Sequence, residues 1–226
     1  MPLWADPYYA FPTINKVKNQ PVVVDVTSSA GNFPNEIAGL ADVITDFREA
    51  NVTRVCELGA GKLRNTLYLL REKFTVTAVE HAQVFDRTQG KERLATAKRF
   101  KHFTHHTPQT FAASADMYDA MLLINVVNIV PDLNDRARMI AACATHLRKG
   151  GLLVWMTQYG EPHYRRGAST RMRICDGYCY GLNNERQTFV KEFEIPEIRA
   201  MLPRNKFREC RQLNVRFNHA FLYERR

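Results

Sequence analysis

Apolar segments alternate with amphipathic segments along the middle of this chain. The apolar runs are typical of buried strands, and the segments between them repeat apolar residues every three or four positions, as helices do. Residues 120–127 are almost all apolar, as expected for a parallel strand covered on both faces. This alternation predicts a doubly wound α/β domain. Strands are predicted at residues 53–58, 74–80, 100–105, 120–127 and 152–157, and helices at 35–50, 65–73, 88–99 and 134–148.

The two ends of the chain differ from its middle. Five prolines interrupt residues 1–34, which are predicted to be irregular apart from a short β-like run at 22–24. A stop at Lys149-Gly150-Gly151 ends the last helix of the alternating region. Near the C-terminus we expect a helix at 195–202 and strands at 207–213 and 219–225, which close one edge of the same sheet.

Charge is distributed unevenly along the sequence. The 226 residues carry a formal net charge of +9, and residues 160–226 contribute +6 of it, from 14 basic and 8 acidic side chains. A basic surface favours an anionic partner, although a solvated basic face is the simpler interpretation. The odd number of cysteines, five, favours a reducing cytoplasm. Cys175 and Cys179 lack the repeated spacing of a zinc site, so no metal is expected. No apolar run is long enough to predict a membrane span.

The loop between the first predicted strand and its helix is the most informative stretch. Its glycines allow a sharp turn and the close approach of a ligand. A dinucleotide fingerprint fails here because Arg64 stands where its third glycine would be. Glu57 would repel a pyrophosphate but suits a ligand with a cationic end, such as S-adenosylmethionine, which has no phosphate. Glu80 ends the next strand and can accept hydrogen bonds from the ribose hydroxyls of either ligand.

Four landmarks, in order over about residues 50–160, resemble those of the Rossmann-like S-adenosylmethionine-dependent methyltransferases. The sequence departs from that family at Leu63, where a third glycine is usual. An acidic or amide residue after the third strand is not obvious in residues 105–109. The landmarks are the acidic loop Glu57-x-Gly59-x-Gly61, the strand end Val79-Glu80, a fourth strand over 118–127 and a helix–glycine–strand signature over 147–153.

This resemblance implies a Rossmann-like methyltransferase fold: a doubly wound, mostly parallel seven-stranded sheet with an antiparallel C-terminal edge hairpin. It implies one domain over residues 1–226, in which 1–34 lies over the cleft, 35–160 binds the cofactor, and 161–226 forms an acceptor lid and closes the sheet. The implied activity is methyl transfer from S-adenosylmethionine. The residues expected at the cofactor are Glu57, Gly59, Ala60, Gly61, Asn65, Glu80, His81, Asn125 and Val126.

The sequence constrains the methyl acceptor less than the cofactor. A D/N-P-P-Y-like run, expected of enzymes that methylate nucleobase amino groups, is missing after the fourth strand, where residues 125–131 read NVVNIVP. No Pro-Cys pair is present for 5-methylcytosine chemistry. The basic tail favours a nucleic acid or another anionic acceptor. A neutral small molecule and a non-catalytic, cofactor-binding scaffold remain as alternatives.

The candidate catalytic residues are Asn125, Tyr159 and His163. Asn125 ends the fourth strand, and Tyr159 can stack on a planar acceptor. His163 can serve as a base because the pKa of imidazole lies near neutrality, although a surface histidine is the more common case. The candidate acceptor-binding residues are Tyr164, Arg165 and Arg166, of which the arginines can bind phosphate or carboxylate.

Overall fold

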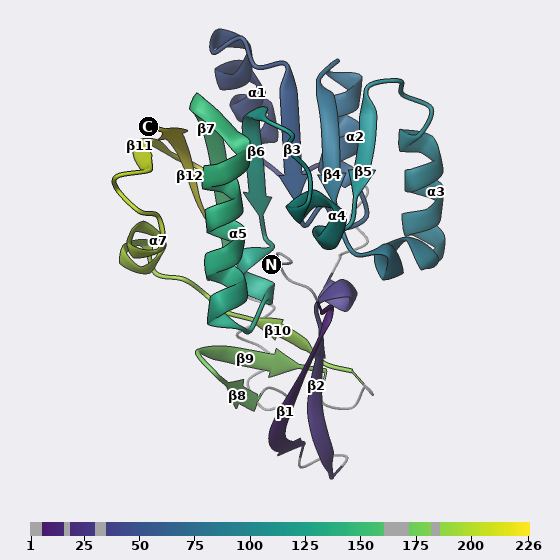
Figure 1. The fold of residues 1–226 in the computed structure, drawn as a ribbon. Helices are drawn as coiled ribbons and strands as arrows, with labels where there is room; N and C mark the ends of the chain where they lie inside the picture. The colour runs from purple at the N-terminus through teal and green to yellow at the C-terminus, as the bar shows by residue number, and fades with distance from the viewer. Residues whose placement is uncertain (1–5, 16–18, 30–34, 161–171, 182–185) are drawn as a thin grey trace.

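The structure, a computed structural model, describes residues 6–15, 19–29, 35–160, 172–181 and 186–226. Its central sheet contains β3 (Arg54–Leu58), β4 (Thr75–Val79), β5 (Phe103–His106), β6 (Tyr118–Ile124), β7 (Leu147–Gln158), β11 (Phe207–Leu213) and β12 (Asn218–Arg225). The order across this sheet is β11-β12-β7-β6-β3-β4-β5 (Figure 1). Strands β3 to β7 are parallel, whereas β12 is antiparallel to both β7 and β11. The predicted α/β fold with an antiparallel edge hairpin is confirmed.

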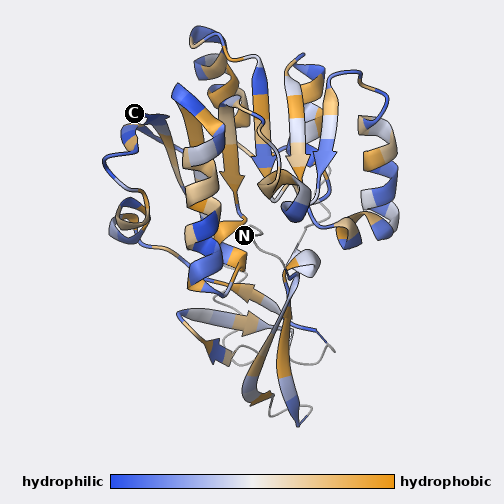
Figure 2. Ribbon diagram, viewed as in Figure 1, coloured by the Kyte–Doolittle hydropathy of each residue, from blue (hydrophilic) through white to orange (hydrophobic). Residues whose placement is uncertain are grey.

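Helices pack on both faces of this sheet, so alternate residues of each strand enter two separate cores. In β6, Ala120 and Leu122 belong to one core, and Met121 and Leu123 belong to the other. Burial on both faces explains why β6 is apolar at almost every position and largely orange in Figure 2. The first core is covered by α1 (Leu40–Glu49), α2 (Arg64–Arg71) and α3 (Thr88–Ala97), and the second by α4 (Pro108–Ala112), α5 (Leu133–His146) and α7 (Ile195–Met201).

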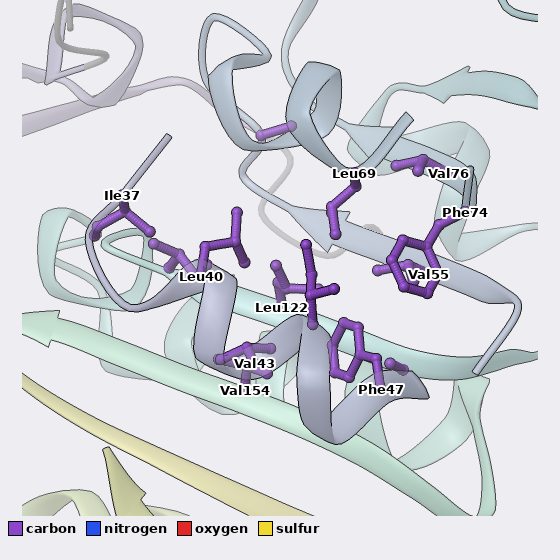
Figure 3. Close-up of a cluster of buried hydrophobic side chains, with 14 of the residues drawn as sticks. Ile37, Leu40, Val43, Phe47, Val55, Leu69, Phe74, Val76, Leu122 and Val154 are labelled. Carbon is purple, nitrogen blue, oxygen red and sulfur yellow. The ribbon is translucent and has the colours of Figure 1, made fainter. Parts of the chain in front are cut away.

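Helix α1 illustrates how the sequence pattern becomes packing. Leu40, Val43 and Phe47 recur at three- and four-residue spacing and are fully buried. Figure 3 shows them directed at Val55 of β3 and Leu122 of β6. The helix begins later than predicted, after Gly39, whose φ of +86° is unsuited to the first turn.

A second group of strands lies beyond the carboxyl ends of the central strands (Figure 1). It contains the hairpin β1 (Tyr8–Asn15) and β2 (Gln20–Asp25), and the small sheet β8 (Met172–Ile174), β9 (Gly177–Tyr180) and β10 (Thr188–Val190). We call these five strands the β module. Its two parts meet where the Gln187 N–H donates to the Val23 carbonyl at 2.8 Å and the Asp25 N–H donates to the Gln187 carbonyl at 2.8 Å. They also share a small core that contains Val24 and Phe189.

The β module corrects the prediction of an irregular N-terminal segment for residues 8–15, which form β1, whereas the β-like run predicted at 22–24 is confirmed as part of β2. Prolines do not prevent pairing here because Pro12 lies in a bulge of β1, between Phe11 and Ile14. The predicted stop at Lys149-Gly150-Gly151 is also misplaced. Helix α5 ends at His146, and these residues lie in an irregularity of β7, where Gly150 has a φ of +75°. None of the described helices combines the length and the apolar character needed to cross a membrane.

Candidate functional site

A cavity of about 290 Å³ lies between the carboxyl ends of the central strands and the β module. Ligands of open α/β sheets bind at this edge. The parallel register brings the ends of β3, β4 and β6 together, since Leu58 lies beside both Val79 and Leu123. The walls of the cavity come from the loop after β3, the end of β4, the turn after β6, and the β module with the short helix η1 (Val26–Ser29).

The loop after β3 turns sharply and leaves no room for a side chain at Gly59. Gly59 and Gly61 have φ values of +69° and +53°. A Cβ atom on Gly59 would lie 2.1 Å from Cγ2 of Val126, so only glycine permits this approach. Leu63, which stands at the third glycine position of the resembled family, has a φ of +62° and is fully buried. The backbone therefore keeps the left-handed conformation even though glycine has been replaced.

Glu57 is buried, with 2% of its surface exposed, and its carboxylate is bound within the protein. Asn65 Nδ2 donates to Oε1 at 2.8 Å, and Thr66 Oγ1 donates to Oε2 at 2.6 Å. Burial raises the pKa of Glu57, and these two hydrogen bonds offset part of the increase. The carboxylate thus lies against the first turn of α2, the place where a dinucleotide fold would hold its pyrophosphate. This geometry disfavours a dinucleotide.

Glu80 follows β4 and is held by the backbone. The Gly61 N–H donates to Oε2 at 2.6 Å, and the His81 N–H donates to Oε1 at 2.8 Å. Burial raises the pKa of Glu80 to about 7, against the opposing effect of these two hydrogen bonds. Each carboxylate oxygen retains a further lone pair for a ligand hydroxyl. Burial lowers the pKa of His81 to about 4, so its imidazole is neutral at pH 7.

Asn125 lies at the turn after β6, in a left-handed conformation with a φ of +53°. Its N–H donates to the Met156 carbonyl at 2.9 Å, which fixes the turn against β7. Its Oδ1 is buried and has no hydrogen-bond partner among the described residues. Because buried polar atoms are nearly always paired, this oxygen is a candidate acceptor for a donor of a bound ligand.

The structure brings together all the residues predicted to contact the cofactor. Each one lines the cavity: Glu57, Gly59, Ala60, Gly61, Asn65, Glu80, His81, Asn125 and Val126.

The candidates from the segment after β7 are placed differently. Tyr159 is not among the residues that line the cavity. Its hydroxyl donates to Glu194 Oε1 at 2.7 Å, and its ring centroid lies 4.0 Å from that of His219. His163, Tyr164, Arg165 and Arg166 lie outside the described residues.

Residues 1–34 and 161–226 were expected to lie over the cleft, but sequence reasoning missed the strands of the β module and the side chains that they place in the cavity wall. Tyr180, Phe189 and Val190 line the cavity, together with residues 26–29 of η1. The only signal for β10 is the pair Phe189-Val190 within a three-residue strand, which is too short to show a period.

No protein-family model matches this sequence, and no curated protein matches it. Solved structures do match. The PH0226 protein from Pyrococcus horikoshii OT3 is 10% identical, with a TM-score of 0.68 over 83% of this chain and 88% of that one. The glycopeptide N-methyltransferase MtfA with S-adenosylhomocysteine is 16% identical, with a TM-score of 0.64 over 88% and 95%.

A third match is an S-adenosylmethionine-dependent methyltransferase from Clostridium acetobutylicum ATCC 824, with 12% identity and a TM-score of 0.62 over 84% of this chain and 92% of that one. At such low identity the matches report on the fold. The chain therefore has the class I Rossmann-like fold of S-adenosylmethionine-dependent methyltransferases.

Proposed function

We propose that this protein transfers a methyl group from S-adenosylmethionine to a small-molecule acceptor. The observation that carries the proposal is the Glu80 carboxylate, fixed by two backbone N–H groups at the end of β4 and facing the same cavity as the glycine loop. A carboxylate in that place suits ribose hydroxyls. The fold is that of proteins whose described activity is methyl transfer from this cofactor.

The residues present fit this cofactor. Gly59, Ala60 and Gly61 line the cavity with no side chain larger than a methyl group, and Glu80 would accept from the ribose. The unpartnered Oδ1 of Asn125 would accept a hydrogen bond from the ammonium group of the methionine end. S-Adenosylmethionine supplies, when bound, an electrophilic methyl group on a sulfonium. The contribution of the protein is to hold the nucleophile in line with that methyl group and to exclude water.

The acceptor side of the cavity favours a small molecule with little charge. The wall formed by the turn after β6, the end of β7 and β10 includes the apolar residues Ile129, Val130 and Phe189, with Thr188 and Gln158 as polar groups. Solved structures of this fold include a mitomycin 7-O-methyltransferase and a 1,6-didemethyltoxoflavin N1-methyltransferase. The matches give no support to the nucleic-acid acceptor that the basic tail suggested.

Calorimetry with S-adenosylmethionine and with NAD tests the cofactor assignment. We expect binding of the first and none of the second, and binding of NAD alone would refute the proposal. Incubation with methyl-labelled S-adenosylmethionine and a cell extract then tests the activity. We expect label in the small-molecule fraction. Label in nucleic acid would refute the acceptor class, and cofactor binding without transfer to any fraction would favour the scaffold alternative.

A further inference from the structure

The side chain of Arg136 joins the segments that surround the acceptor side of the cavity. It extends from the first part of α5 and is 1% exposed, although it is not among the residues that line the cavity. A buried guanidinium is tolerated only when its charge and its donors are satisfied. Its partners therefore indicate what it holds in place.

Three hydrogen bonds and two aromatic rings enclose this guanidinium. Nε donates to the Val130 carbonyl at 2.6 Å. Nη1 and Nη2 donate to Asp176 Oδ2 and Oδ1 at 2.6 and 3.0 Å, a bidentate pairing. The carbon of the guanidinium lies 5.2 Å from the ring centroid of Phe193 and 5.6 Å from that of Phe189.

These partners belong to the cavity wall or touch it. Val130 and Phe189 both line the cavity, from the turn after β6 and from β10. Asp176 lies in the turn between β8 and β9. The next residue, Gly177, packs so closely on Phe189 that an added Cβ would lie 2.4 Å from Cζ of that ring. One side chain thus links the turn after β6 to the sheet β8–β10.

The neighbouring residue of α5 holds the other half of the β module. Tyr9 of β1 donates its hydroxyl to Asp135 Oδ2 at 2.6 Å. Asp135 is 6% exposed and also pairs with Arg138. Two consecutive residues of α5 therefore anchor the hairpin β1–β2 and the sheet β8–β10 separately.

We propose that Arg136 is a positioning residue for the methyl acceptor: by binding Asp176 and Val130 it sets the place of Phe189 over the cavity. This proposal rests on the proposed function, which assigns the methyl acceptor to the cavity. Lysine would keep the charge but lose the fork that binds both Asp176 oxygens and the Val130 carbonyl together. Removal of Arg136 would also leave the Asp176 carboxylate without its bidentate partner.

Hydrogen exchange tests the structural half of the proposal without requiring activity. In Arg136→Lys we expect amides of β8 to β10 to exchange faster by about tenfold or more, with β3, β4 and β6 unchanged. Tyr9→Phe should affect β1 and β2 instead. Arg199→Lys is the matched control, because Arg199 makes an exposed bidentate pair with Glu209, at 2.8 Å for each bond. Unchanged exchange in β8 to β10, or an equal increase throughout the central sheet, would overturn the proposal.

The functional half of the proposal is tested by measuring the apparent affinities for the acceptor and for the cofactor separately. At saturating labelled S-adenosylmethionine, we expect Arg136→Lys to raise the half-saturating concentration of extract by about fivefold, with a cofactor Kd like that of the wild type. A cofactor Kd that weakens by the same factor would overturn the positioning role. Failure of the wild type to bind S-adenosylmethionine would instead refute the proposed function, while the exchange experiment still decides whether Arg136 holds the wall.

Discussion

Glu80 should make cofactor binding depend on pH near neutrality. Burial raises its pKa to about 7, while the N–H groups of Gly61 and His81 hold both oxygens in place. Ribose hydroxyls donate more strongly to a carboxylate than to a neutral acid. Protonation of Glu80 as the pH falls through 7 therefore weakens binding. His81 does not titrate in this range, because its pKa is about 4.

The magnitude follows from the difference between charged and neutral hydrogen bonds. A hydrogen bond to a charged group contributes roughly 1.5–3 kcal/mol and a neutral one roughly 0.5–1.5 kcal/mol, so protonation should weaken affinity about fivefold to tenfold. With a pKa of about 7, Glu80 is about 90% ionised near pH 8 and about 3% ionised near pH 5.5. Almost the whole effect lies between these two conditions.

The same pKa has a consequence for the stability of the free protein. The ordinary pKa of a glutamate is 4.5, and that of Glu80 in the folded protein is about 7. Between these two pH values Glu80 is protonated in the folded state but ionised in the unfolded chain. Unfolding therefore releases a proton in this range, and the free energy of unfolding decreases as pH rises, by about 3 kcal/mol in total. Glu80→Gln removes this contribution.

Calorimetry with S-adenosylhomocysteine at about pH 5.5 and about pH 8 measures the effect without turnover. We expect the wild type to lose about fivefold to tenfold in affinity at the lower pH, and Glu80→Gln to bind weakly and equally at both. Glu57→Gln is the control, because the pKa of Glu57 is also raised and its titration could contribute to the same pH dependence. We expect this variant to keep the pH dependence of the wild type. A pH dependence in Glu80→Gln equal to that of the wild type would refute the assignment of the titration to Glu80.

Further variants test the loop and the turn after β6. Gly59→Ala should lower the free energy of unfolding by about 2–4 kcal/mol in urea titration because of the 2.1 Å contact with Val126, and Val126→Ala should restore part of it; full stability of Gly59→Ala would contradict the packing. Thr66→Val should lower the free energy of unfolding by about 1–3 kcal/mol near pH 8, since Glu57 Oε2 loses the hydroxyl donor of Thr66, and Thr66→Ser, which keeps a hydroxyl, should retain the stability of the wild type. Asn125→Gly should fold at least as stably, because glycine adopts a φ of +53° and an unpartnered oxygen disappears, yet transfer less label from the cofactor; undiminished transfer would remove Asn125 from the site.

The cofactor side of the site could be predicted from the sequence because it depends on patterns within short stretches of the chain. Buried parallel strands are recognisable as short apolar runs, and parallel pairing places their carboxyl ends at one edge. Glu57 and Glu80 each stand at or just after a strand end, so their convergence follows from chain order alone. What the sequence did not reveal is that Asn65 and Thr66 bind the Glu57 carboxylate, because those contacts depend on the orientation of α2.

The acceptor side depends on contacts between distant segments. Val24 pairs with Gln187 across the chain, and β8 and β10 are only three residues long, so neither periodicity nor propensity predicts them. Tyr159 was predicted to contact the acceptor; its N–H donates to the Phe217 carbonyl and its ring lies against that of His219, contacts between segments far apart in the sequence.

By itself, then, the sequence determined the alternation of strands and helices and the residues at the carboxyl edge of the sheet, because hydrophobic period and glycine chemistry act over a few neighbouring positions. Only the tertiary structure decided how the cavity is closed. That closure depends on the buried Arg136–Asp176 pair and on the meeting of the first and last thirds of the chain, and contacts of such separation leave no local pattern.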